Sequence, residues 1–344
     1  MNPSALGPGG EFDRIRALLG EPRTDTAGRG GSRLSVGPGD DAAVLGEWVI
    51  STDLTVEDVH FRREWIDLGA VGYRAVVVAL SDLGAMGAEP EAVFLSLALP
   101  DAGPEAVREL GAGARAAADW AGAELAGGDL SRSPGPLVLD VVAVGKTRDP
   151  VLRSGARPGD DLWVSGCLGG AAAAVEAWER GETPSPPMLR RFEAPHPPLG
   201  LLASLRRTGR VTSGIDVSDG LLSDAGHLAA ASGVAIHIHD ARVPVDPALE
   251  HLDPSRRLTL ALAGGEDYEI LFTAPVAARG ALEPVRLERG GAEGARVHTD
   301  EGEPVRLTRI GEVTEGEGVW RKGRDGVSHR IRGGGFDHFP SDVP

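Results

Sequence analysis

The sequence predicts a mixed α/β (α+β) fold built from two domains. Apolar runs typical of buried strands alternate with segments of helical period along the chain. The 344 residues exceed what one ordinary hydrophobic core holds, and they suit two units of about 150–200 residues. A content of 41 % hydrophobic and 25 % charged residues is typical of a globular protein. We therefore expect an N-terminal domain over 1–149 and a C-terminal α/β domain over 150–344.

The first half is expected to alternate between strand and helix. Apolar runs predict strands over 48–53, 92–99 and 137–145, and helical periodicity predicts helices over 69–87 and 104–121. Pro104 supports the start of the second helix, because proline is favoured in the first helical turn.

The second half shows the same alternation. Strands are expected over 162–165, 211–219, 234–239 and 268–273, and helices over 170–180, 199–207 and 220–232, with a further helix ending at 258–263. We expect 183–198 to be a proline-rich connection and 274–304 to be mostly surface.

Composition and charge exclude several classes of function. The single cysteine, Cys167, allows neither an intrachain disulfide nor a cysteine-based zinc site. The net charge of −16 argues against a nucleic-acid partner, which requires a basic surface. No stretch reads as long and apolar enough to span a bilayer, and 1–11 lacks the basic and apolar regions of a secretory signal. We expect a cytoplasmic protein with no membrane partner.

Five short segments place aspartate beside glycine or a hydroxyl residue, at strand ends or in helices. They cover 39–43, 51–53, 81–83, 127–129 and 216–220. Mg²⁺ prefers oxygen ligands and commonly bridges carboxylates to substrate phosphates, and glycine lets the backbone approach closely. The segments therefore predict a magnesium site for a phosphorylated ligand.

Asp82 carries the most information among these acids. It falls within the apolar stripe of the helix over 69–87, and neither Val78 nor Met86, four residues away, can form an ion pair with it. A carboxylate on a buried face is costly unless it is paired or bound to metal, so we interpret Asp82 as a metal ligand. A cap, turn or surface role is expected instead for three other acids, Asp40, Asp101 and Asp224.

Familiar nucleotide-binding motifs are absent. Gly145-Lys146-Thr147 matches the end of a Walker A loop, but Asp140 stands where the first glycine is required. The protein-kinase signature set is missing as well. ATP would have to bind through another scaffold.

Eight segments, taken in order, resemble those of one enzyme superfamily. They are the five acidic segments, with 51–53 extended by 60–61, and the segments 153–160, 264–269 and 336–339. The set is similar to the ATP-binding superfamily that includes aminoimidazole ribonucleotide synthetase and selenophosphate synthetase. Within it, the chain most resembles the thiamine-monophosphate kinase family, over residues 10–339.

This resemblance implies the two-domain aminoimidazole ribonucleotide synthetase-like fold, with an N-terminal domain that pairs across a homodimer. It also implies ATP as co-substrate, thiamine monophosphate as acceptor and several Mg²⁺ ions. The implied metal ligands are Asp41, Ser51 (through its carbonyl), Thr52, Asp53, Asp82, Asp129, Asp216 and Asp219. The implied ATP contacts are Gly128, Arg153 and Ser218, and the implied contacts to thiamine phosphate are His60, Asp267 and Phe336.

Three positions depart from the family pattern without removing an implied metal ligand. Leu130 and Ala263 stand where a hydroxyl residue is usual, and Phe336 replaces a common tyrosine.

The expected acceptor is a phosphate monoester, which is largely ionised at neutral pH and needs no strong general base. The reaction needs in-line positioning and relief of the repulsion between two polyanions, which carboxylate-held Mg²⁺ supplies. We therefore expect direct transfer of the γ-phosphoryl group of ATP, without a catalytic base or covalent nucleophile.

Two alternatives stay open. A sibling enzyme of the superfamily would act on another acceptor, although the reactive cysteines and the glycine-rich substrate segment of three siblings are missing. A non-catalytic nucleotide- and metal-binding regulator would keep the fold, but it would be expected to lose acids from the set. A calcium-binding structural protein is disfavoured, because no EF-hand loop is present.

Overall fold

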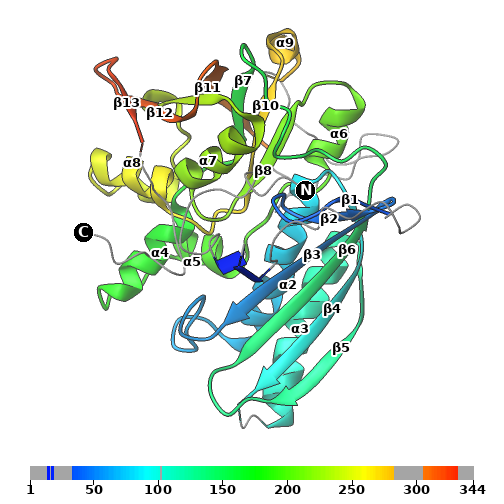
Figure 1. Cartoon of the computed structure of the whole chain (residues 1–344). Helices are drawn as coiled ribbons and strands as arrows, with labels where there is room; N and C mark the ends of the chain where they lie inside the picture. The colour runs from blue at the N-terminus through cyan, green and yellow to red at the C-terminus, as the bar shows by residue number, and fades with distance from the viewer. Residues whose placement is uncertain (1–13, 16, 19–32, 101–102, 283–304, 332–344) are drawn as a thin grey trace.

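Two β-sheets with associated helices make up the fold, as the sequence predicts (Figure 1). The computed structural model describes residues 14–15, 17–18, 33–100, 103–282 and 305–331. Strands β1 to β6 form the first sheet, and β7 to β13 form the second.

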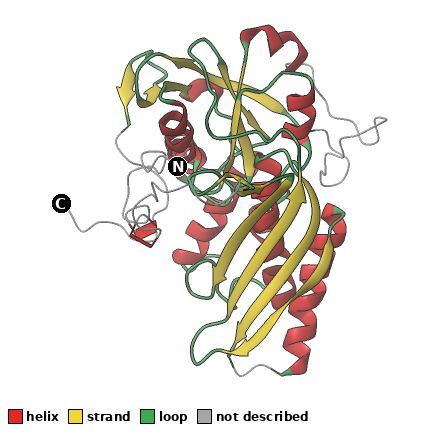
Figure 2. Ribbon diagram, turned by 45° about the vertical axis from the view of Figure 1, so that its right-hand side comes forward, coloured by secondary structure: helices red, strands yellow, loops and turns green. Residues whose placement is uncertain are grey.

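The first sheet has six strands in the order β1-β2-β3-β6-β4-β5, and neighbours are antiparallel except β4 and β5. The strands are β1 Leu34–Val36, β2 Ala43–Leu45, β3 Trp48–Val56, β4 Glu89–Leu99, β5 Glu124–Arg132 and β6 Val138–Lys146. Helices α2 (Leu68–Ala85) and α3 (Pro104–Ala121) cover one face (Figure 2). No described helix covers the other face, which we call the open face. Along β6, the residues directed toward the helices are buried, and the alternate residues, directed toward the open face, are half-buried.

Glycines let α2 and α3 pack with their backbones almost in contact. A Cβ atom at Gly113 would lie 1.8 Å from the carbonyl oxygen of Gly69, and one at Gly72 would lie 2.0 Å from that of Leu110. Glycine in mid-helix is otherwise unfavourable. Gly72 and Gly113 are therefore explained by close helix packing.

By length and apolar composition alone, α2 would suffice to cross a membrane, so the expectation that no stretch would do so was wrong. However, 72 % of this window is buried inside the protein. A single such helix is weak evidence of a membrane span, because a buried core helix has the same composition. Its packing against the first sheet and α3 assigns α2 to the core.

The second sheet has seven strands in the order β13-β12-β9-β11-β7-β10-β8. They are β7 Asp161–Ser165, β8 Ser213–Val217, β9 Ala235–His239, β10 Glu269–Ala274, β11 Leu307–Thr314, β12 Gly318–Lys322 and β13 Ser328–Arg330. Helices α7 (Leu221–Ser232) and α8 (Pro254–Ala263) belong to the core on one face, and α6 (Leu201–Arg207) and α9 (Arg279–Leu282) to the core on the other. Every residue of β7, β8 and β10 is buried.

The two halves share hydrophobic contacts. Helices α4 (Gly170–Glu179) and α5 (Pro186–Glu193) follow the first sheet in sequence, yet Ala174 and Phe192 pack into its core. The α5 helix was missed by the sequence analysis, which expected only a connection there. The boundary between residues 149 and 150 stays a prediction.

Candidate active site

Arg153, in the segment that connects the two sheets, holds the two acids that precede β2. Its guanidinium donates from Nη2 and Nε to Oδ1 of Asp41, at 2.7 and 3.1 Å. Its backbone N–H donates to Oδ1 of Asp40 at 3.1 Å, and its carbonyl accepts from the Ser232 hydroxyl at 3.0 Å. Arg153 therefore ties acids of the first half of the chain to α7 of the second.

The second oxygen of Asp41 has no such partner. Oδ2 is buried and receives no hydrogen bond from any described residue. Burial raises the pKa of Asp41 although Arg153 opposes the shift, and burial followed by the Asp41 charge raises the pKa of Asp40 to about 7. A buried carboxylate oxygen without a partner is costly, so its surroundings fit a bound cation.

Three carboxylates from distant parts of the chain converge here, and Asp41 is one of them. One oxygen each of Asp41, Asp82 and Asp216 lie within 4.8 Å of one another, and we call these residues the buried acid cluster. They come from the segment before β2, from α2 and from β8. Neighbouring hydroxyls orient two of them: Ser51 donates to Asp82 Oδ2, and Ser81 donates to Asp216 Oδ2 at 2.8 Å.

Electrostatics explain why the buried acid cluster suits a cation. Burial, followed by the charges of Asp216 and Asp41, raises the pKa of Asp82 well above its ordinary value. Burial and the Asp41 charge raise the pKa of Asp216 to about 7, although the Ser81 hydrogen bond opposes this. Like-charged carboxylates out of water disfavour their own ionisation unless a cation joins them. An all-oxygen donor set with an orphaned buried oxygen fits Mg²⁺.

The first sheet divides the other expected metal ligands between its two faces. On β3, Ser51 is buried and contacts Asp82 of α2, so Asp53, two residues on, shares the helix-covered face. Thr52 between them is exposed on the open face. Strand register places Asp129 of β5 on the open face as well. It lies opposite Ser96 of β4, and Ser96 lies opposite Asp140 of β6. Asp140 in turn lies opposite Leu54 of β3, which follows the pleat of Thr52.

Gly128 precedes Asp129 and allows close strand packing. Its φ is +151°, and a Cβ there would lie 1.8 Å from the Leu95 carbonyl oxygen, so no side chain fits. The structure thus brings together Asp41, Ser51 and Asp82 with Asp216, whereas Asp129 lies apart on an exposed edge strand.

The segment that carries Ser218 and Asp219 is held by the loop before β10. The backbone N–H groups of Glu266 and Tyr268 donate to the carbonyls of Ser218 and Val217, both at 2.8 Å. Glu266 and Tyr268 both have positive φ, at 76° and 52°. Such strain outside glycine persists only where surrounding contacts impose it, and it is frequent at functional sites.

Arg74 of α2 supplies those contacts and was not foreseen from the sequence. Its side chain is 3 % exposed, forms an ion pair with Glu266 and donates to the Phe192 carbonyl at 2.6 Å. Tyr268 donates its hydroxyl to the same Glu266 carboxylate at 2.8 Å. Arg74 is buried on α2 eight residues before the half-buried Asp82, and it too is a charged residue in an apolar helix, so the signal that identified Asp82 also applied to it.

The three expected substrate contacts have different outcomes. Both carboxylate oxygens of Asp267 accept from the backbone N–H of Gly169, at 3.0 and 2.9 Å, at the start of α4. The Nδ1 atom of His60 accepts from the backbone N–H of Val56 at 3.0 Å. Phe336 lies outside the described residues. Their roles toward substrate stay predictions.

Comparison with known proteins finds relatives along most of the chain. Residues 39–147 match the family model described as AIR synthase related protein, N-terminal domain. A thiamine-monophosphate kinase of Rhodopirellula baltica is 33 % identical over 90 % of this chain and 93 % of its own length. The crystal structure of thiamine-monophosphate kinase from Stenotrophomonas maltophilia K279a is 36 % identical, with a TM-score of 0.71, and the match covers 92 % of this chain and 95 % of that one.

The chain belongs to the thiamine-monophosphate kinase family. A further solved member, described as "AaThiL complexed with AMPPCP and TMP", is 30 % identical with a TM-score of 0.73, over 98 % of this chain and 99 % of that one. The protein is therefore an enzyme of the kinase class with the fold of this family.

Proposed function

We propose that this enzyme transfers the γ-phosphoryl group of ATP to thiamine monophosphate and so produces thiamine diphosphate, with Mg²⁺ required. The observation that carries the proposal is the buried acid cluster with its orphaned Asp41 oxygen. The substrate pair is supported by the relative whose structure is described as complexed with AMPPCP and TMP.

The residues proposed to hold Mg²⁺ form two groups. Asp41, Asp53, Asp82 and Asp216 lie on the helix-covered side, with Ser51 offering its carbonyl, and Asp219 follows Asp216 beyond the end of β8. Thr52 and Asp129 lie on the open face. When bound, Mg²⁺ supplies positive charge that offsets repulsion between the two phosphorylated substrates. Several ions, rather than one, suit ligands so divided.

Arg153, Gly128 and Ser218 are proposed to contact ATP. Arginine stays protonated, and Arg153 engages only one oxygen of Asp41. A phosphate group could therefore share its guanidinium. His60, Asp267 and Phe336 are proposed to contact thiamine monophosphate. The acceptor phosphate is already a nucleophile, so the side chains have only to bind, orient and exclude water, and transfer is direct and in line.

A homodimer that pairs through the open face is part of the proposal. Leu54 and Phe94 are 53 % and 39 % exposed, and their strand register places both on this face. Exposed apolar side chains on one sheet face are typical of an association surface. The cytoplasmic location expected from the sequence stays a prediction.

The test is a coupled assay of ADP release from Mg-ATP, with and without thiamine monophosphate, with the product identified by chromatography. We expect thiamine diphosphate to form, and EDTA to abolish its formation. Asp82→Asn should lower kcat/KM by about 10³-fold, because the cations lose a charged ligand. Asp119→Asn, at an exposed acid of α3, is the control and should match the unchanged enzyme.

Other outcomes would redirect the proposal. ATP turnover that requires a different phosphate acceptor would identify a sibling activity. Tight ATP binding without turnover on any acceptor would identify a regulator. Thiamine diphosphate formed unchanged in EDTA would remove the role assigned to Mg²⁺.

A further inference from the structure

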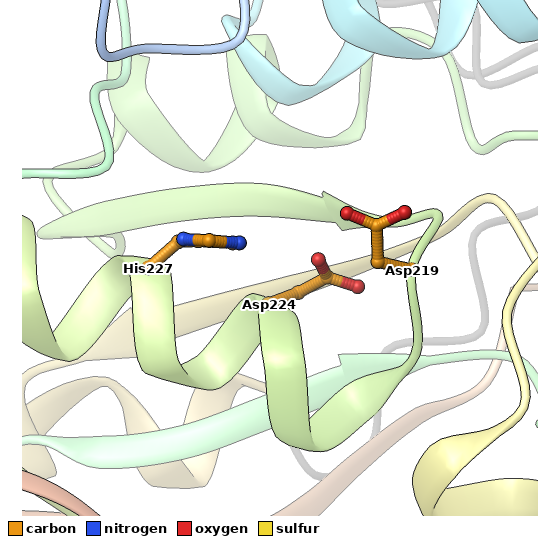
Figure 3. Close-up of side chains that lie close together, drawn as sticks. All are labelled: Asp219, Asp224 and His227. Carbon is orange, nitrogen blue, oxygen red and sulfur yellow. The ribbon is translucent and has the colours of Figure 1, made fainter. Parts of the chain in front are cut away.

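A second group of potential ligands lies around the start of α7. One atom each of Asp219, Asp224 and His227 lie within 4.8 Å of one another, and we call these residues the α7 triad. Figure 3 shows Asp219 in the loop before α7, with Asp224 and His227 projecting from the helix toward it. Residues three apart on a helix share a face, so the positions of Asp224 and His227 follow from helix geometry.

Asp224 is fixed by burial and by the backbone of the loop. It is 2 % exposed, and its Oδ2 accepts from the backbone N–H of Gly220 at 3.1 Å. A cap, turn or surface role was expected for Asp224; its burial rules out the surface role, and its hydrogen bond to Gly220 does not account for Asp219 and His227 beside it. The capped residue directly follows Asp219, so Asp224 controls the loop that presents this acid.

The backbone on both sides of Asp219 is held in place by its surroundings. Gly220 has a φ of +111°, and a Cβ there would lie 2.9 Å from the Ala263 carbonyl oxygen. Ser218, on the other side of Asp219, accepts from the Glu266 N–H at 2.8 Å. The backbone is thus held at both neighbours of Asp219, and the α7 triad places Asp224 and His227 beside its carboxylate.

We propose that His227 and Asp224 are positioning residues that orient the Asp219 carboxylate toward the cations accompanying ATP. The inference rests on the proposed role of Asp219 as a metal ligand. In this arrangement a ring N–H of His227 donates to one oxygen of Asp219, Asp224 fixes the loop through Gly220, and the other oxygen of Asp219 stays available. Outer contacts of this kind commonly change metal affinity by about 10- to 100-fold.

The rival arrangement makes His227 itself a ligand. Two carboxylates and an imidazole suit Mn²⁺, Zn²⁺ or Co²⁺ better than Mg²⁺, which prefers oxygen. The two arrangements differ in whether a nitrogen atom touches the metal, and this difference can be measured without turnover.

The experiment titrates the protein with Mn²⁺ in the presence of AMPPCP and follows free Mn²⁺ by electron paramagnetic resonance. His227→Ala and Asp224→Asn should raise the half-saturating Mn²⁺ concentration by about 10-fold or more. His227→Asn, which keeps an N–H donor, should recover part of the loss. His251→Ala, at an exposed histidine of the same half, should match the unchanged protein.

Melting temperatures in EDTA establish whether each variant is folded. If His227→Ala does not fold, the Mn²⁺ affinity of His227→Asn is used in its place. Unchanged Mn²⁺ affinity in a folded His227 variant would overturn the inference. So would nitrogen hyperfine coupling from His227 in the pulsed spectrum, since it would make His227 a ligand. The Mn²⁺ titration contains no phosphate acceptor, so its result does not depend on which acceptor the enzyme uses. If the titration gives the expected result but the coupled assay yields no thiamine diphosphate, the proposed function is contradicted and this inference is not.

Discussion

The two faces of the first sheet are built from alternate residues of the same strands, yet they differ in almost every physical respect. One face lies under α2 and α3 and holds Ser51 against Asp82. The other has no described helix over it and exposes Leu54, Phe94 and Asp129. The comparison teaches that the described residues bury one side of the sheet and build the acid site there, whereas the other side is the one assigned to the proposed dimer.

The largest effect is expected where the covered face has no space. Gly113→Ala should destabilise the protein by about 3 kcal/mol or more, because the new Cβ would lie 1.8 Å from the Gly69 carbonyl oxygen and force α2 and α3 apart. Gly111→Ala is the matched control on the same helix. Its Cβ would approach only the end of the Arg115 side chain, at 3.3 Å, so helix propensity should make it neutral or stabilising by up to about 1 kcal/mol.

Chemical denaturation of both variants measures the difference. Equal stability of Gly113→Ala and Gly111→Ala would mean that the helices are not in backbone contact.

The next effect concerns how stability depends on pH when metal is removed, and it is expected from Asp216 of the buried acid cluster. Because the pKa of Asp216 is raised from its ordinary value of 3.8 to about 7, the folded protein keeps a proton that the unfolded chain releases. This contribution to stability is complete below pH 4 and is lost as the pH rises through 7. In EDTA, Asp216 should therefore lower the free energy of unfolding by about 3 kcal/mol between pH 5 and pH 8.

Asp216→Asn should flatten this part of the profile, and the difference between the two profiles isolates the residue from all other titrating groups. Addition of Mg²⁺ at pH 8 should stabilise the unchanged protein and have less effect on the variant. If the pH profile of the Asp216→Asn variant runs parallel to that of the unchanged protein, the raised pKa of Asp216 is contradicted.

The smallest effect on folding is expected on the open face. Leu54→Asp should change the free energy of unfolding of the protomer by less than about 1 kcal/mol, because the side chain is already exposed, but it should abolish the proposed dimer. Val59→Asp, at a site of nearly equal exposure outside the strand, is the control and should leave the dimer intact. Light scattering coupled to size exclusion gives the mass of each. A dimer that survives Leu54→Asp would place the association surface elsewhere.

Sequence patterns predicted those elements whose ends and faces are locally marked. The predicted helix over 104–121 coincides with α3, because Pro104 begins it and Gly122 ends it in the left-handed conformation. Strand β5 was missed, because Gly127 and Gly128 favour a loop and only pairing with β4 makes that segment extended. Helix α5 was missed because its initial prolines resembled a connection, although proline is compatible with a first turn.

The site was predictable to the extent that single residues violate a pattern. Asp82 stood out because a carboxylate interrupts an apolar face, and the structure places it in the buried acid cluster. The convergence of Asp216 with Asp41 had no local signal, since it depends on how the two sheets meet. His227 was passed over because its spacing from Asp224 acquires meaning only once Asp219 is known to lie beside them.

The strand order of the second sheet determines which parts of the protein can fold first during synthesis. Strand β8 carries Asp216, and among the described strands it pairs only with β10, which follows it in the chain after α7, β9 and α8. The hydrogen bond between Ser81 and Asp216 likewise spans 135 residues. During synthesis the first sheet and its helices can therefore assemble early, while the acid site has no fixed geometry until β10 has left the ribosome and inserted between β7 and β8. A nascent chain released before that point would hold the first sheet with its helices, but Asp216 would not yet be fixed beside Asp41 and Asp82.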